Sequence, residues 1–348
     1  MINDITTHVI DPCTSEQWAE LAQTGDLFHS PPWLRVLRDS FGVEPSAVLL
    51  DRAGADTQAG LPFCRIEDLV GKRISTLPFS DFSGPLGVTS DQDWHALLSA
   101  VLDMGAPFRI RTVHDERLTR DDRLEHIGRA KWHVVELASD PDETWGRLAS
   151  SARQNIRRAK RNGLEVTVSS EPSAMAQFED LHLGLRRQKY GMLSQPPEFF
   201  QSLVEHFAGD HAVVIASSEG VPVASILLLR WGNRAYYKFN ASRVEALSTR
   251  ANDLVMWEAI DYATTQWQCK LLDLGLSDID QPGLIRYKSK YAAIEGEIET
   301  FRSKSPDESS LSAEARTLAA NVAALTAAEG SPDDLCRSIS SHLYKYFC

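Results

Sequence analysis

Three strand-like runs joined by very short turns, followed at once by a helix and a further strand-like run, constrain this chain most. The runs HAVVIASS, VPVASILLLR and RAYYKFNAS are apolar and meet at the turns SSEG and WGN. Turns of this length join antiparallel neighbours into hairpins. Residues 251–266 predict a helix, because Met256, Ile260 and Ala263 recur at helical spacing on one face, and CKLLDLGL predicts a strand after it. This order predicts a mixed α/β (α+β) fold with antiparallel strands at its centre.

The whole chain predicts two mixed α/β domains and a helical tail. We expect an N-terminal domain over residues 1–139, a second domain over 140–302 and a tail over 303–348. The tail begins with the polar stretch SKSPDES and continues into two helices without groups suited to chemistry. Its composition therefore indicates a packing or oligomerisation role.

The expected elements outside the central region rest on apolar periodicity and on Gly and Pro at their ends. In the first domain, helices are expected near 15–22, 29–42, 91–104 and 115–125, and strands near 46–51, 60–66, 72–79, 107–113 and 132–137. In the second domain, we expect one continuous helix over 144–163, a strand over 164–170, a helix over 172–189, a short helical piece at 286–290 and a strand over 295–301.

Composition and motifs exclude several classes of protein. The 43% hydrophobic and 24% charged content is that of a globular protein. The five cysteines form no CxxC pair, and HExxH, GxxxxGK[ST] and GxGxxG are absent, so a metal site and a nucleotide-binding loop lack support. No run reaches the ~18 apolar residues of a membrane span, and the N-terminus does not resemble a signal peptide. We therefore expect a cytoplasmic protein without a membrane span.

The net charge of −12 is distributed unevenly along the chain. Residues 1–140 carry 13 Lys and Arg against 22 Asp and Glu, whereas 141–302 carry 19 against 20. The stretch from 147 to 161 contains no acidic residue and includes Arg147, Arg153, Arg157, Arg158, Lys160 and Arg161. On a helix most of these side chains form a ridge suited to the phosphates of an RNA backbone. The alternative is a solvated face that pairs with acidic neighbours from the first domain.

Eight segments over residues 29–301 carry a resemblance to a known family. They are HSPPWLRVL, LPFSDFSGPLG, SARQNIRRAKRNGLEV, LRRQKYGM, GVPVASILLLRWGNRAYYKFNAS, ANDLVMWEAI, LLDLGLSD and GLIRYKSKY. In these segments the chain resembles the Fem-type aminoacyltransferases and their GNAT-like relatives. The resemblance implies two GNAT-like domains in tandem. It also implies transfer of an aminoacyl group from aminoacyl-tRNA to an amine, on a peptidoglycan precursor or a small natural product, while other relatives are taken to use acyl-CoA.

The resemblance also implies an acceptor site. Arg186 and Tyr190 stand four residues apart on a predicted helix and match an Arg and Tyr that line the acceptor site of Fem-type enzymes. Tyr237, rather than its strand neighbour Tyr236, matches a further site-lining tyrosine of the family. Without the resemblance, an Arg packed on a Tyr ring and ordinary core tyrosines explain these residues.

Lys288 in GLIRYKSKY matches the lysine of the family's Phe-Lys-x-x-Phe-like motif, and Ala292 stands where relatives often carry glycine. A cation at this point stabilises the oxyanion that develops on the attacked carbonyl. Asp273, at a strand end, either orients Lys288, takes a proton from the acceptor amine or caps the next loop. Lys290 is expected to be an ordinary surface lysine.

The beginning of the helix at 251 is a second candidate for donor binding. Arg250 and Asn252 lie where exposed amides and the positive end of the helix dipole suit a phosphate or pyrophosphate. The Gly-rich Q/RxxGxG/A loop that GNAT enzymes use for coenzyme A is absent from this position. Helix capping by Thr249 or Asn252 explains the same residues without a ligand.

The sequence as a whole predicts an amide-forming transferase with aminoacyl-tRNA as donor and an amine-bearing acceptor. No Ser-His-Asp or Cys-His arrangement is recognisable, so we expect direct attack without a covalent enzyme intermediate and without a metal or cofactor beyond the donor itself. One alternative is an acyl-CoA-dependent N-acyltransferase. Another is a non-catalytic GNAT-like binding module. The sequence leaves the oligomeric state open.

Overall fold

The structure is a computed structural model that describes residues 5–52, 58–304, 310–328 and 330–347. Its contacts divide the chain into unit 1, with Met1–Ala130, Gly296–Ala319 and Lys345–Cys348, and unit 2, with Lys131–Glu295 and Ala320–Tyr344. This division differs from the expected boundaries at 139 and 302. The strands β6 (Leu124–Glu136) and β12 (Ile294–Ser303) each begin in one unit and end in the other, and the tail residues are shared between the units.

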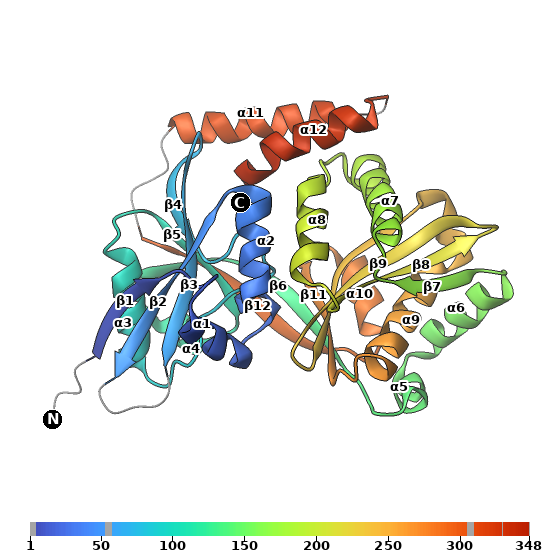
Figure 1. The fold of residues 1–348 in the computed structure, drawn as a ribbon, viewed down its shortest axis with the longest axis horizontal. Coiled ribbons are helices and arrows are strands. Elements are labelled where there is room, and N and C mark those ends of the chain that lie inside the picture. The colour runs from blue at the N-terminus through green and yellow to red at the C-terminus, as the bar shows by residue number, and fades with distance from the viewer. Residues whose placement is uncertain (1–4, 53–57, 305–309, 329, 348) are drawn as a thin grey trace. The chain divides into compact units, whose positions relative to one another are not determined.

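Unit 1 is built on strands in the order β1-β2-β3-β4-β5-β12 (Figure 1). The strands are β1 (Ile5–Ile10), β2 (Glu44–Arg52), β3 (Ala59–Asp68), β4 (Gly71–Ser75) and β5 (Phe108–Val113). The helices are α1 (Glu16–Leu21), η1 (Ala22–Thr24), η2 (Leu27–His29), α2 (Pro31–Phe41), α3 (Asp91–Leu102), α4 (Glu116–Arg120) and α11 (Ser310–Thr326), of which α11 continues into unit 2. Its core forms where Leu50 and Phe63 of the sheet pack against Leu97 of α3.

Helix α2 shows how local sequence sets an element in this unit. The Ser30 hydroxyl accepts a hydrogen bond from the Trp33 amide, and Pro31 occupies the first turn, where its missing N–H costs nothing. The helix ends at Gly42, whose φ of 63° is left-handed and therefore favours glycine. The predicted beginning and end of this helix are thus confirmed.

Unit 2 is built on strands in the order β6-β11-β10-β9-β8-β7 (Figure 1). The strands are β7 (Glu165–Ser169), β8 (His211–Ser218), β9 (Val221–Trp231), β10 (Arg234–Ser242) and β11 (Leu271–Asp278). The helices are α5 (Pro141–Arg147), α6 (Ser150–Arg161), α7 (Pro172–Tyr190), α8 (Pro197–His206), η3 (Val244–Thr249), α9 (Ala251–Thr265), α10 (Pro282–Ser289) and α12 (Asp333–Leu343). A last turn, η4 (Tyr344–Phe347), follows α12. The two predicted hairpins are confirmed, because β8 pairs antiparallel with β9 and β9 pairs antiparallel with β10.

The apolar runs of β8 and β9 reflect helices on both sides of the sheet. Ala212, Val214 and Ala216 share a core with α9, while the alternate residues Val213 and Ile215 are equally buried and point to the other face. Helix α7 also contacts β8, β9 and β10. Because neither face meets water, the strands lack the polar alternation of a half-exposed sheet.

Several expected elements are corrected. The helix expected over 144–163 is two helices, because Leu148 and Ala149 have extended backbone angles between α5 and α6. The helix expected over 115–125 ends at Arg120, since β6 begins at Leu124. Strand β1 and helix α8 were not predicted. Across the described residues, no helix has both the length and the apolarity needed to cross a membrane.

Candidate active site

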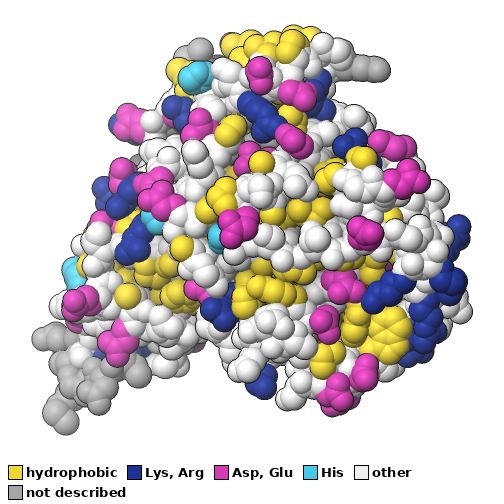
Figure 2. Space-filling view, turned by 45° about the vertical axis from the view of Figure 1, so that its right-hand side comes forward, with side chains coloured by type: hydrophobic (Ala, Val, Ile, Leu, Met, Phe, Trp, Pro, Cys, Tyr) yellow, Lys and Arg dark blue, Asp and Glu magenta, His cyan; other side chains and the backbone are white. Residues whose placement is uncertain are grey.

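Helix α6 presents a basic face on unit 2. Ala152, Ile156 and Ala159 are buried, so the arginines between them point outward, and Arg157, Arg158 and Arg161 are exposed. Arg157 lies over the Trp145 ring at 5.6 Å. Among the residues that the structure describes, no ion-pair partner is found for Arg158 or Arg161. Figure 2 shows Lys and Arg side chains gathered at the right-hand edge of this view of the molecule.

Two residues of the predicted basic ridge, Arg153 and Lys160, form contacts within unit 2. The Arg153 guanidinium donates to the Gly146 carbonyl oxygen at 2.7 Å and thereby caps the end of α5. Lys160 forms an ion pair with Glu258 at 3.1 Å. Burial and, to a smaller extent, the negative charge of Glu258 raise the pKa of the nearby Asp261. Lys160 is therefore paired, but with an acidic residue of unit 2 and not of the first domain, whereas Arg157, Arg158 and Arg161 are exposed.

The beginning of α9 is occupied by contacts within the protein. Arg250 is exposed with a left-handed φ of 68°, and the Thr249 hydroxyl accepts from the Ala251 amide at 3.3 Å. The Asn252 side chain accepts from Asn240 at 3.3 Å and donates to the Ser242 hydroxyl at 3.2 Å. The capping interpretation accounts for Thr249, and Asn252 joins α9 to β10.

A buried carboxylate, Asp253, lies in the first turn of α9 and was not singled out from the sequence. Its Oδ1 accepts from the Tyr291 hydroxyl at 2.9 Å and lies 3.4 Å from the Lys290 Nζ. Its Oδ2 accepts from the Asn155 side chain at 3.1 Å. The carboxylate brings negative charge to the end of the helix where a pyrophosphate would need positive charge. No local motif marked Asp253, since its partners are 98 residues before it and 37 and 38 after it.

Lys288 lies inside unit 2 rather than in an open cleft. Its side chain is only 2% exposed, and its Nζ donates to the carbonyl oxygens of Gly275 at 3.1 Å and Leu276 at 2.7 Å. Both carbonyls lie in β11, where Gly275 has a left-handed φ of 68°. The Nζ is therefore held inside unit 2 by two backbone carbonyl groups, and its catalytic role stays a prediction.

Asp273 is connected to Lys288 through the backbone. The Asp273 Oδ1 accepts from the Gly275 amide at 2.7 Å, and its Oδ2 accepts from the Trp132 indole at 2.9 Å. The carboxylate therefore shapes the bend at Gly275 whose carbonyl receives Lys288. This arrangement accounts for the predicted orienting and loop-capping roles together, while proton abstraction by Asp273 stays a prediction.

The expectation for Lys290 is wrong. Its side chain is 24% exposed, pairs with Asp253 and lies 5.1 Å from the Tyr287 ring centre. The partner could not be read from the local sequence, because it comes from another helix. The turn also includes Ala292 with a φ of 57°, so an alanine takes a left-handed conformation that favours glycine.

Arg186 and Tyr190 lie at the end of α7. The Arg186 Nε donates to the Leu193 carbonyl oxygen at 2.9 Å, and no partner for its other two nitrogens is found among the described residues. Tyr190 is 47% exposed. Tyr237 is half-buried, and burial, with a smaller contribution from Tyr190, raises its pKa. Tyr237 therefore acts as a neutral hydroxyl at ordinary pH.

The tail contacts this end of α7. Arg187 binds Asp333 and donates to the Ser331 carbonyl oxygen at 2.6 Å. The positive charge of Arg186 acts on Tyr344, although burial is the larger influence and raises the pKa of that hydroxyl. The residues around Arg186 thus come from α7 and the C-terminal segment.

His133 on β6 is a second buried group that the sequence did not indicate. Its side chain is fully buried, and neither ring nitrogen has a hydrogen-bond partner within the described part of the chain. The Nε2 is 3.6 Å from the Glu295 carboxylate. Burial, and then the charge of Lys288, lowers the pKa of His133, so the ring is neutral near pH 7.

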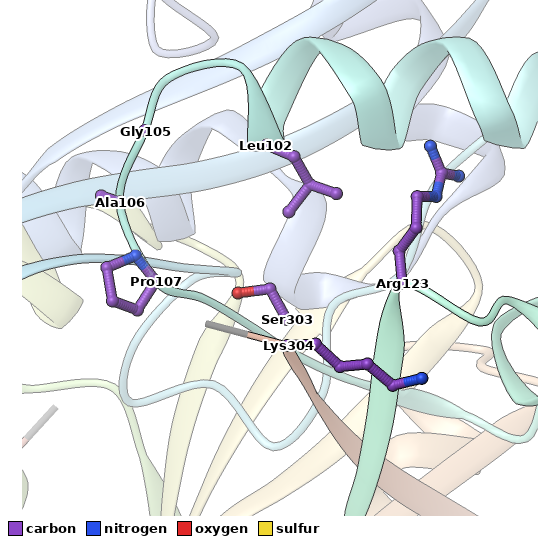
Figure 3. Close-up of a pocket in the computed structure, with 7 residues that line it drawn as sticks. All are labelled: Leu102, Gly105, Ala106, Pro107, Arg123, Ser303 and Lys304. Carbon is purple, nitrogen blue, oxygen red and sulfur yellow. The ribbon is translucent and has the colours of Figure 1, made fainter. Parts of the chain in front are cut away.

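A hollow of about 440 Å³ in unit 1 contains none of the predicted site residues. Figure 3 shows Leu102, Pro107 and Ser303 around this space. Arg123 lines it too, but its guanidinium already binds Asp121 and the Ser99 hydroxyl. Lys304 lines the hollow as well, and none of the lining residues belongs to the predicted site.

Comparisons with known proteins agree with the fold. Residues 147–289 match the family model of the acetyltransferase (GNAT) domain. FemX has a similar structure, with 14% identity and a TM-score of 0.64 over 84% of this chain and 96% of that one. L-PGS from Bacillus licheniformis has 14% identity and a TM-score of 0.52 over 72% and 82% of the chains.

A tandem GNAT protein from the clavulanic acid biosynthesis pathway is also similar, with 11% identity and a TM-score of 0.51 over 87% of this chain and all of that one. Among curated proteins, none matches the sequence. The expected fold class is confirmed: a mixed α/β protein with the GNAT fold, tandem-GNAT neighbours and C-terminal helices. The resemblance to Fem-type and GNAT-like acyltransferases is confirmed as well.

Proposed function

We propose that the protein is an acyltransferase that passes an aminoacyl group from aminoacyl-tRNA to an amine on a peptidoglycan precursor or a small natural product. The observation that carries this proposal is the exposed basic face of α6, formed by Arg157, Arg158 and Arg161. These side chains can follow successive phosphates of an RNA strand. A tRNA donor would also place the reaction in the cytoplasm.

The reaction requires no covalent enzyme intermediate. The acceptor amine attacks the carbonyl carbon of the aminoacyl ester, a C–N bond forms, and the C–O bond to the ribose breaks. The proton lost by the amine goes to the departing ribose oxygen. Orientation of the two substrates supplies much of the rate in such a transfer. Arg186, Tyr190 and Tyr237 would hold the acceptor, and Lys288 would act on the charge of the developing oxyanion, oriented through Asp273.

An acyl-CoA donor is the second candidate, because residues 147–289 match an acetyltransferase domain. The beginning of α9 would then hold the pyrophosphate, with Arg250 beside it. The Asp253 carboxylate in the same turn and the internal hydrogen bonds of Asn252 weigh against this site. A non-catalytic binding module is the third candidate.

Binding of deacylated tRNA and of coenzyme A at several salt concentrations tests the proposal. We expect tRNA binding that weakens steeply with salt and falls in a variant with Arg157, Arg158 and Arg161 changed to Ala. A matched control changes Lys72, Arg120 and Arg302, three exposed basic residues of unit 1, and removes the same charge. Equal loss in both variants would point to unspecific attraction, and saturable binding of coenzyme A alone would favour the second candidate.

A further inference from the structure

The turn that carries Lys288 is tied directly to helix α6. We define this Lys288 turn as residues 287–292. The Ala149 amide, at the beginning of α6, donates to the Lys290 carbonyl oxygen at 2.9 Å. This bond explains why Ala149 is not helical: its amide serves the turn instead of a helix. The contact joins segments that are 141 residues apart in the chain.

A second connection passes through Asp253. One oxygen of this carboxylate accepts from Tyr291 at 2.9 Å and faces Lys290 at 3.4 Å, and the other accepts from Asn155 of α6 at 3.1 Å. Asp253 and Tyr291 are 5% and 0% exposed, so water competes weakly for these bonds. A single buried carboxylate therefore bridges α6 and the Lys288 turn.

The turn needs such support from outside. Ala292 holds a left-handed φ of 57°, a conformation that is unfavourable for a residue with a Cβ. The Tyr287 hydroxyl donates to the Asn252 carbonyl oxygen at 2.8 Å and adds a third attachment, to α9. The conformation of the turn is therefore set by the two helices it contacts.

Helix α6 faces two partners at once. Asn155 points to Asp253, while Arg157, Arg158 and Arg161 begin two residues later and are exposed. Ala152, Ile156 and Ala159 pack into the core that contains α9. A polyanion that restrains the outer side of this short helix also restrains the groups on its inner side.

We infer that Asp253 and Lys290 are positioning residues that couple RNA bound on α6 to the placement of the Lys288 turn. The inference rests on the proposed function, because it takes RNA as the molecule bound on α6. Neither residue touches the substrate. Asp253 and Lys290 act by holding Asn155 and the Lys288 turn in one arrangement. RNA bound on α6 therefore restrains the position of Lys288.

Hydrogen exchange of the full chain, with and without bulk deacylated tRNA, tests this coupling. In the wild type, tRNA should slow exchange in residues 284–294, and the Tyr291 amide, which donates to the Lys288 carbonyl oxygen, should slow by about tenfold. In Lys290→Met and Asp253→Asn, tRNA should bind with unchanged affinity, since neither residue lies on the basic face. The slowing at 284–294 should disappear in both variants.

The difference in exchange rate between the tRNA-bound and the tRNA-free protein separates coupling from a purely structural role. A purely structural role of Asp253 or Lys290 would change the exchange rate equally with and without tRNA. Ser289→Ala is the matched control, because Ser289 is exposed in the same turn and bonds only to its own helix at the Ile285 carbonyl. If Asp253→Asn unfolds, Lys290→Met still tests the coupling, because the Lys290 side chain is partly exposed and its replacement disturbs the core less. Wild-type tRNA binding without slowing at 284–294, or slowing that persists in Lys290→Met, would overturn the inference and leave the donor proposal intact. Absence of tRNA binding would overturn both.

Discussion

The Nζ of Lys288 donates a hydrogen bond of 2.7 Å to the carbonyl oxygen of Leu276, inside the end of β11. A second bond reaches Gly275, whose amide in turn donates to the Asp273 carboxylate. A buried lysine whose Nζ is held by two carbonyl oxygens has little freedom to move. Lys288 is therefore fixed to the end of β11, and the proposed influence of this lysine on the reaction depends on how that end is held.

Lys288→Met should lower turnover more than substrate binding. It keeps the aliphatic stem and removes the charge, and loss of one oxyanion-stabilising group costs about a hundredfold or more in rate. The variant also leaves the Gly275 and Leu276 carbonyls without their partner, so stability should fall by about 1–3 kcal/mol. Steady-state kinetics at a temperature well below the melting point separate the two effects.

Arg286→Met is the control for that measurement, because Arg286 is an exposed cation on the same helix. Lys290 is unsuitable as a control, since it pairs with Asp253. Equal turnover in Lys288→Met and Arg286→Met would remove Lys288 from the catalytic residues.

A pH-dependent contribution to stability is expected from Glu179 on α7. Burial raises the pKa of this carboxyl to about 7, although Arg337 of α12 is 3.6 Å away and opposes the shift. The folded state therefore holds a proton that the unfolded state releases near its ordinary pKa of ~4.3. Because the folded state binds more protons in this window, stability should fall as the pH rises from about 4.5 to about 7.

Glu179→Gln should reduce that slope and raise the free energy of unfolding at pH 8, as measured by urea denaturation at pH 5 and pH 8. Glu205→Gln on α8 is the control, because Glu205 is exposed. An unchanged difference between the two pH values in Glu179→Gln would show that the carboxyl is ionised in the folded protein throughout.

A pH dependence of the same sign, but at higher pH, is expected in unit 1, at His114. Its Nδ1 is 2.7 Å from the Glu299 carboxylate, which is 4% exposed and raises the pKa of the histidine. This stabilising pair is fully present below the ordinary histidine pKa of ~6.5 and is lost as the pH rises through the higher folded value. Nuclear magnetic resonance titration should give a pKa for His114 above 6.5 that drops in Glu299→Gln, and an unchanged His114 pKa in that variant would contradict the prediction.

The parts of the fold that local sequence could predict are those governed by short-range rules. The hairpins of β8, β9 and β10 follow from turn length, and α2 follows from its Ser, Pro and Gly signals. The break between α5 and α6 could not be predicted, because the Ala149 amide finds its partner at Lys290, far along the chain. Strand β1 could not be predicted either. Most of its side chains are exposed, and it is a strand because it pairs with β2.

In the candidate site, too, local sequence could predict some features, whereas others depend on tertiary contacts. Arg157, Arg158 and Arg161 could be predicted as exposed because α6 has a simple helical period of Ala and Ile on its buried side. The burial of Lys288 and the pairing of Lys290 could not, since both depend on β11 and α9, which local spacing does not relate to the motif. Resemblance identified the motif, but only the tertiary structure distinguishes its two lysines.

Adjacent arginines at the end of α7 give the last prediction. Arg186 is anchored by its Nε to the Leu193 carbonyl, whereas Arg187 binds Asp333 and the Ser331 carbonyl of the C-terminal segment. Arg186→Gln should raise the apparent Michaelis constant of the acceptor by roughly ten- to a hundredfold, because a charge-assisted contact contributes about 1.5–3 kcal/mol. Donor binding should stay close to normal.

Arg187→Gln should instead lower the melting temperature and leave the acceptor's Michaelis constant nearly unchanged, since the contacts of Arg187 hold α12. Kinetics with varied acceptor, together with thermal unfolding of both variants, check this contrast, and equal acceptor constants in the two variants would exclude Arg186 from the acceptor site.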